Sequence, residues 1–141
     1  NQFKRLETFR KIRTTNKNKI IDLLKKDKRW NNQFRFVEYP KKIKASYMVL
    51  PILIDRKLFH KKKKFINFRE KKGLETRPII SGSFVNQPSS KLYNLNPGNK
   101  QFRGAQEIQD LGFLIGLHTK NITTSKVKFI IDLLFSIDTI K

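Results

Sequence analysis

Residues that could bind an anion gather in one part of the chain. Arg77 stands near the end of a segment at 74–80 whose residues are typical of a strand, and an arginine there can offer a two-pronged donor to a carboxylate or phosphate. Small or amide-bearing residues follow it, and their backbone N–H groups and side chains would add polar contacts. With Arg77, we take these as candidate substrate-binding residues: Ser81, Gly82, Ser83, Asn86 and Gln87.

His118 is a further candidate. It follows apolar residues at 112–117, which we predict to form another strand. If this strand neighbours the one at 74–80, Arg77 and His118 would face one pocket, where the imidazole could exchange protons or donate to an oxyanion. A lone histidine is more often structural, and His60, inside a lysine-rich run, is interpreted as a surface residue.

No motif in the sequence carries catalysis alone. A glycine-rich dinucleotide loop, a Walker loop and a His-Glu-x-x-His pair are all missing. The absence of cysteine excludes a thiol nucleophile, a disulfide and a cysteine-bound metal centre within these residues, and two histidines are too few for a histidine-rich metal site. We therefore assign no catalytic residue and no metal site, and interpret five aspartates as surface charges: Asp22, Asp55, Asp110, Asp132 and Asp138.

The chain has 141 residues, which suits one domain, and a formal net charge of +21. Such a charge favours nucleic-acid binding in general. Here the basic residues are spread through every segment, and the one dense run, Lys61–Lys64, is typical of the solvated face of a helix. A small basic RNA-binding protein is therefore kept as the alternative, and nucleic acid is not the partner we expect.

Hydrophobic periodicity predicts an α+β fold, with helices covering a small, mainly antiparallel sheet. Pro51 should place its strand at an edge or in a bulge, and Gly73 should end a helix in the left-handed conformation. The last helix, capped by Thr123 or Thr124, should bury Val127, Ile130, Ile131, Leu134 and Ile137. No apolar run approaches the ~20 residues that cross a bilayer. The expected elements are helices at 2–28, 57–72 and 104–110, strands at 34–37, 46–54, 74–80 and 112–117, and a long loop at 81–101.

Four short stretches occur in an order known from one family: Gly73-Leu74-Glu75-Thr76-Arg77-Pro78, Gly82-Ser83, Gln87-Pro88, and Gly112-Phe113-Leu114-Ile115-Gly116. They resemble the C-terminal domain of the pyridoxal-phosphate-dependent sugar aminotransferases (the DegT/DnrJ/EryC1/StrS family), nearest the nucleotide-sugar 3-dehydratase branch. That branch usually has Asn where Ser83 stands, so dehydration and transamination both stay open.

The resemblance implies fold type I, in which a small C-terminal domain closes over a large cofactor-binding domain in a homodimer. Residues 1–141 would form that single small domain. The large domain, with the lysine that attaches pyridoxal phosphate or the histidine that replaces it, would lie upstream, so the piece alone is expected to be inactive. An iron–sulfur cluster bound upstream is not addressed by this sequence.

The implied protein is a cytoplasmic enzyme that acts on a nucleotide-linked 4-keto-6-deoxyhexose in the synthesis of cell-envelope sugars such as those of lipopolysaccharide. Arg77 would bind an anionic group of the nucleotide sugar, the Ser81–Gln87 loop would make polar contacts, and His118 would stand near the pocket mouth. Its other partners would be its own large domain and a second copy, with no membrane. A structural remnant of the family without activity is a third reading.

Overall fold

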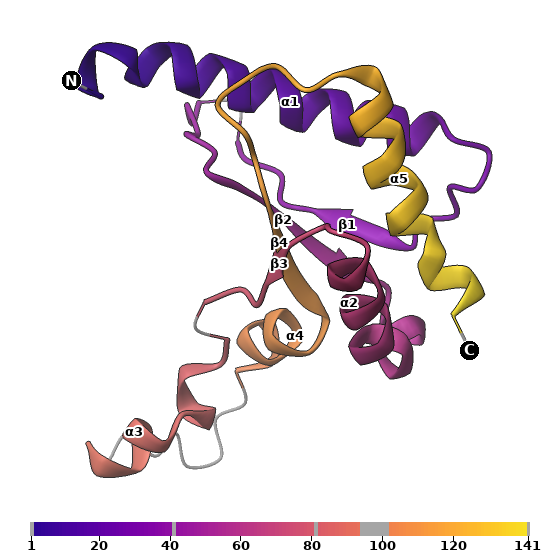
Figure 1. Ribbon diagram of the computed structural model, residues 1–141. Helices are drawn as coiled ribbons and strands as arrows, with labels where there is room; N and C mark the ends of the chain where they lie inside the picture. The colour runs from indigo at the N-terminus through magenta and orange to yellow at the C-terminus, as the bar shows by residue number, and fades with distance from the viewer. Residues whose placement is uncertain (1, 41, 81, 94–101, 141) are drawn as a thin grey trace.

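The computed structural model describes residues 2–40, 42–80, 82–93 and 102–140. These residues form an α+β fold around a four-stranded sheet of order β1-β2-β4-β3, in which every neighbouring pair is antiparallel (Figure 1). The predicted fold class is therefore confirmed. The strands are β1 (Phe34–Phe36), β2 (Val49–Ile54), β3 (Thr76–Arg77) and β4 (Gly112–Gly116).

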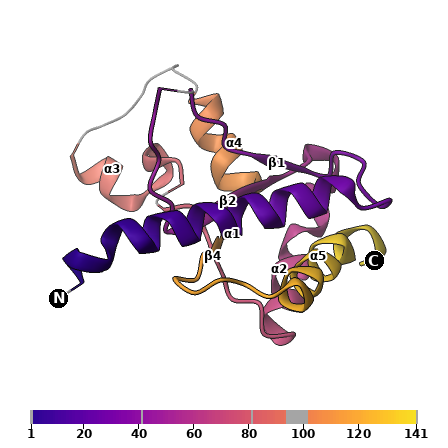
Figure 2. The same cartoon turned by 90° about the horizontal axis from the view of Figure 1, so that it is seen from above.

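Figure 1 shows where the helices lie around this sheet. Long helix α1 crosses one end with α5 beside it, whereas α4 and α3 lie toward the other end (Figure 1), and the view from above places α3 and α4 on the opposite side of α1 from α5 (Figure 2). None of the helices in the described ranges is long and apolar enough to cross a membrane. The helices are α1 (Leu6–Lys26), α2 (Lys62–Lys71), α3 (Pro88–Leu92), α4 (Arg103–Leu111) and α5 (Thr124–Thr139), with 3-10 turns at Phe3–Arg5, Arg56–Lys61 and Phe84–Asn86.

The core lies between one face of the sheet and helices α1, α2 and α5. Alternate residues of β2, namely Leu50, Ile52 and Ile54, are buried, as the period of a strand with one covered face requires. Helix α5 buries Val127, Ile131, Leu134 and Ile137 as predicted, with Ile130 half-buried. The periodicity in the sequence thus identified the covered face of this helix.

Gly73 ends α2 as predicted. Its φ is +89°, and its N–H donates to the Glu70 carbonyl while the Leu74 N–H donates to the Arg69 carbonyl, both at 3.0 Å. This pair of hydrogen bonds defines a Schellman C-cap. The turn brings the chain back onto the sheet, where Thr76 pairs with Ile115.

The expectation that Pro51 lies in an edge strand is wrong for the strand as a whole. β2 is internal, paired with β1 on one side and β4 on the other. Pairing with β1, however, extends only to Ile52, so Pro51 lies where β2 has a single neighbour, opposite Leu114. Proline has no N–H to donate. It is tolerated here because the pairing of β1 with β2 ends at Ile52, so no β1 residue lies opposite Pro51.

Several predicted elements have different lengths in the structure. The predicted strand at 74–80 is reduced to Thr76–Arg77, because Pro78 cannot donate to a ladder and the chain then leaves the sheet. The predicted helix at 57–72 is a 3-10 turn followed by α2. Within the described part of the predicted loop, residues 82–93 form a 3-10 turn and α3.

Candidate functional site

The segment after β3 is held against α4. Gly82 has a φ of +69°, and a Cβ added to it would lie 3.0 Å from the Gln109 side-chain oxygen. The Ser83 N–H donates to that same oxygen, Gln109 Oε1, at 3.0 Å, and Ser83 is only 1% exposed. Glycine is suited to this place for two reasons, its left-handed backbone and its close approach to Gln109.

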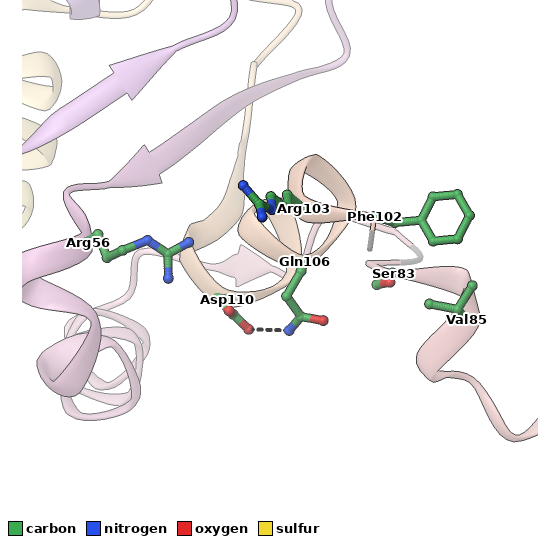
Figure 3. Close-up of a pocket in the computed structure, with 7 residues that line it drawn as sticks. All are labelled: Arg56, Ser83, Val85, Phe102, Arg103, Gln106 and Asp110. Carbon is green, nitrogen blue, oxygen red and sulfur yellow. Dashed lines mark hydrogen bonds between the residues drawn. The ribbon is translucent and has the colours of Figure 1, made fainter. Parts of the chain in front are cut away.

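Asn86 is fixed to the same helix through its side chain. Its Nδ2 donates to Gln106 Oε1 at 2.7 Å and to Gln109 Oε1 at 3.3 Å. The Gln106 Nε2 in turn donates to Asp110 Oδ1 at 2.8 Å, the bond drawn in Figure 3. The loop and the helix therefore share one continuous set of polar contacts.

Two pockets flank this set of contacts. The first, here called the neutral pocket, has a volume of about 390 Å³ and is lined by Pro78, Ile79, Ile80, Gly82, Asn86, Gln87 and Gln109. The second, the arginine pocket, has a volume of about 420 Å³ and is lined by Arg56, Ser83, Val85, Phe102, Arg103, Gln106 and Asp110 (Figure 3). Both volumes lie in the range of small-molecule sites.

Arg77 lies on the exposed surface of β3. Its Nη2 and Nε donate to Glu75 Oε1 at 2.8 and 3.1 Å, and the two side chains are 69% and 76% exposed. Such an open ion pair contributes at most about 1 kcal/mol, so an anionic ligand could replace Glu75 as the partner of Arg77. The hollow next to Arg77 has a volume of about 350 Å³ and includes Leu114 and Gly116.

The prediction that Arg77 and His118 face one pocket is wrong. Their strands are indeed neighbours, but they are antiparallel, and Arg77 pairs with Leu114. His118 lies four residues further along the chain, two residues beyond the end of β4 at Gly116. It is exposed beyond the far end of β4, where its Nδ1 accepts from the Lys120 N–H at 3.1 Å and its carbonyl accepts from Asn16.

The structure thus brings together four of the predicted residues, Gly82, Ser83, Asn86 and Gln87, at the two pockets, while Arg77 lies apart on β3. Ser81 lies outside the described residues. The sequence reasoning missed the partners on α4, and the signal for them was present: Gln106, Gln109 and Asp110 are spaced three and four residues apart, on one face of the predicted helix. Their side chains form this face of the site.

Two interpretations of charged residues need correction. Asp110 and Asp55 are half-buried and accept hydrogen bonds, from Gln106 and from the Lys57 N–H respectively, so neither is a simple surface charge. Lys61 and Lys62 are also half-buried, and burial lowers the pKa of Lys62, whose Nζ donates to the Gln109 carbonyl at 3.0 Å. His60, by contrast, is exposed as predicted.

Comparison with known proteins finds likeness in structure alone. No protein-family model matches the chain, and no curated protein matches its sequence. Three similar solved structures each align with 94% of the chain. They are an E. coli GDP-4-keto-6-deoxy-D-mannose-3-dehydratase with bound hydrated PLP (TM-score 0.74, 18% identity), a mutant of GDP-4-keto-6-deoxymannose-3-dehydratase (ColD) with bound GDP-perosamine (0.76, 18%), and another ColD variant (0.75, 17%).

The chain therefore has the fold found in part of these 3-dehydratases. It spans about a third of their length, 32% of the first and 33% of the other two. The fold expected from the resemblance is confirmed.

Proposed function

We propose that the chain is the substrate-pocket domain of a pyridoxal-phosphate-dependent nucleotide-sugar 3-dehydratase or aminotransferase, acting on a 4-keto-6-deoxyhexose. The observation that carries the proposal is the loop at 82–87, anchored to α4 beside two pockets, in a fold shared with GDP-sugar 3-dehydratases. Synthesis of cell-envelope sugars, a large upstream domain, assembly as a homodimer and a cytoplasmic location belong to the same proposal.

The resemblance places the cofactor-binding residue upstream of this chain, and the proposal keeps it there. Burial lowers the pKa of Lys62, and its Nζ donates a hydrogen bond to the Gln109 carbonyl. The residues that line the pocket beside Lys62 come from two helices and the turn before α2. We therefore assign the cofactor to residues outside this chain, and assign this domain to the substrate.

Within this proposal Arg77 binds an anionic group of the nucleotide sugar. Its present partner, Glu75, is exposed and held by one oxygen, so exchange for a phosphate oxygen would replace one charge-assisted pair with another. The 82–87 loop contacts neutral parts of the substrate. His118, at the far end of β4, is no longer assigned to this pocket.

Arg77→Ala in the full-length protein should lower kcat/KM for the nucleotide sugar about 10- to 100-fold, because a charge-assisted hydrogen bond to the substrate contributes about 1.5–3 kcal/mol. Steady-state kinetics would measure this. Arg10→Ala is the matched control, since Arg10 also pairs with an exposed glutamate, Glu7, but lies on α1. Equal kcat/KM for the Arg77 variant and the unaltered protein would remove Arg77 from the substrate site.

The net charge of +21 keeps RNA binding as the second candidate. If RNA were the ligand, the logarithm of the binding constant would fall steeply and linearly with the logarithm of salt concentration, because each phosphate contact releases counterions. Our proposal predicts weak RNA binding with no sequence preference that is lost near physiological salt. Fluorescence anisotropy with a labelled RNA checks this, and tight binding retained at that salt would favour the RNA-binding function.

A further inference from the structure

The polar contacts between α4 and the loop have a fixed direction that begins at Asp110. A carboxylate oxygen accepts hydrogen bonds and donates none. Because Asp110 Oδ1 lies 2.8 Å from the Gln106 side chain, four residues earlier on α4, Gln106 must turn its Nε2 toward Asp110. Its carbonyl oxygen, Oε1, then faces the loop.

Asn86 is next in this series. With Gln106 Oε1 facing it, the group that Asn86 presents at 2.7 Å must be its donor, Nδ2. Gln109 imposes the same choice, because its Oε1 accepts from the backbone N–H of Ser83, which can only donate, and also lies 3.3 Å from Asn86 Nδ2. Two acceptors of fixed polarity therefore turn the amide nitrogen of Asn86 toward α4.

The carbonyl oxygen of Asn86, which like Gln109 is an exposed residue, takes no part in these contacts. Among the residues that the structure describes, none donates to Asn86 Oδ1 or accepts from Gln109 Nε2. Both side chains line the neutral pocket, whose described lining contains no charged side chain. One acceptor and one donor suit a hydroxyl group, which can donate and accept at once. A phosphate oxygen is itself a hydrogen-bond acceptor, so it would be repelled by the carbonyl oxygen of Asn86.

We propose that Asp110, acting through Gln106, is a positioning residue that makes Asn86 a hydrogen-bond acceptor and so selects a neutral, hydroxylated ligand such as a sugar over an anion in the neutral pocket. This rests on the proposed function for the chemical class of the ligand. The arginine pocket on the other side of Gln106 is lined by the charged side chains of Arg56, Arg103 and Asp110.

Asp110→Asn tests the proposal. An asparagine at 110 can present either its oxygen or its nitrogen, so Gln106 is free to reverse, and Gln109 Oε1, at 3.3 Å, is then the one acceptor of fixed polarity that still orients Asn86. With methyl α-mannoside as the neutral probe and inorganic phosphate as the anionic one, NMR titration of the 141-residue chain should show the mannoside dissociation constant rising about five- to tenfold in the variant, the effect of one neutral hydrogen bond. The side-chain amide signal of Asn86, assigned with Asn86→Asp, should shift in the same variant without any ligand.

Glu107→Gln is the matched control, since it makes the same chemical change on the same helix at a residue paired with Arg35, outside the series. The double variant Asp110→Asn with Asn86→Asp should recover mannoside binding, because a carboxylate at 86 accepts whichever way Gln106 turns. A merely structural role of Asp110 would give no such recovery.

Unchanged mannoside affinity and an unchanged Asn86 amide signal in Asp110→Asn would overturn the proposal, as would an unaltered chain that binds phosphate but not the mannoside. The Arg77→Ala kinetics separately judge the proposed function. An Asn86 signal that responds to Asp110 as expected, with mannoside binding, supports the inference even if those kinetics remove Arg77 from the enzyme site.

Discussion

Asn16→Leu is expected to lower the free energy of unfolding by about 3 kcal/mol, because it removes three hydrogen bonds and leaves their partners partly buried. Asn16 is 2% exposed on α1. Its Nδ2 donates to the carbonyls of His118 and Lys120 at 3.0 and 2.9 Å, and its Oδ1 accepts from the Ile122 N–H at 3.1 Å. One side-chain amide thus supplies hydrogen-bond partners for three backbone groups of the segment that joins β4 to α5.

Urea unfolding followed by circular dichroism measures this loss. Asn18→Leu is the control, since Asn18 is exposed on the same helix and should change stability by no more than about 0.5 kcal/mol. A loss below about 1 kcal/mol for Asn16→Leu would mean that water replaces the amide and that Asn16 does not hold this connection.

Arg69→Met is expected to raise the free energy of unfolding by about 2 kcal/mol. Arg69 is fully buried on α2, with its guanidinium 3.7 Å from the ring centre of Phe65 and 4.1 Å from that of Phe113. Its Nε donates to the Phe65 carbonyl at 3.4 Å, but Nη1 and Nη2 have no hydrogen-bond partner among the described residues. The two rings offset only part of the cost of burying the charge, whereas methionine fills a similar volume without it.

The same residue predicts a dependence on pH. Burial lowers the pKa of Arg69 well below its ordinary value, to about 9, with Glu70 opposing the shift. Below about 9 the folded and unfolded chains both carry the proton, and the buried charge destabilises the fold in full. Above about 9 the folded chain loses a proton that the unfolded chain keeps, so stability rises with pH. The advantage of Arg69→Met should therefore shrink as pH rises above about 9.

Thermal melts of the unaltered protein and of Arg69→Met, recorded from about pH 7 to about pH 10.5, would give the difference in stability on both sides of the Arg69 pKa. Using the difference between the two proteins removes the contribution of the many lysines that titrate in both. Lys71→Met, an exposed change on the same helix, should alter stability little at any of these pH values. A destabilised Arg69→Met would show that the two rings and Nε stabilise the guanidinium more than its burial costs.

The sequence was sufficient for the parts of the fold that depend on local patterns. The helix at α5 follows from apolar residues at three- and four-residue steps, and the end of α2 follows from Gly73, because few other residues accept its backbone angles. Strand lengths were harder to predict. β3 stops at Arg77 because its neighbour and Pro78 decide where pairing ends, and the apolar run at 79–80 gives no sign of this.

The candidate site was predicted on the loop but not on its supporting helix. The loop was found because Gly82, Ser83 and Asn86 are typical of polar binding segments. His118 was predicted to share a pocket with Arg77 on the assumption that the last residues of two neighbouring strands lie at the same edge of the sheet. β3 and β4 are antiparallel, so their last residues lie at opposite ends of the pair. The hydrogen bond between Gln106 and Asp110 could not be predicted from the type of either residue, because it depends on how the two side chains are oriented on α4.

The brevity of the two outer strands has a consequence for handling the protein at high concentration. A sheet edge recruits foreign strands when it exposes a long ladder of unpaired backbone groups. Here β1 has three residues and β3 has two, and each outer strand carries an exposed arginine, Arg35 or Arg77. Despite its twelve phenylalanines, the folded chain offers little template for fibril growth, so amyloid formation should require unfolding first.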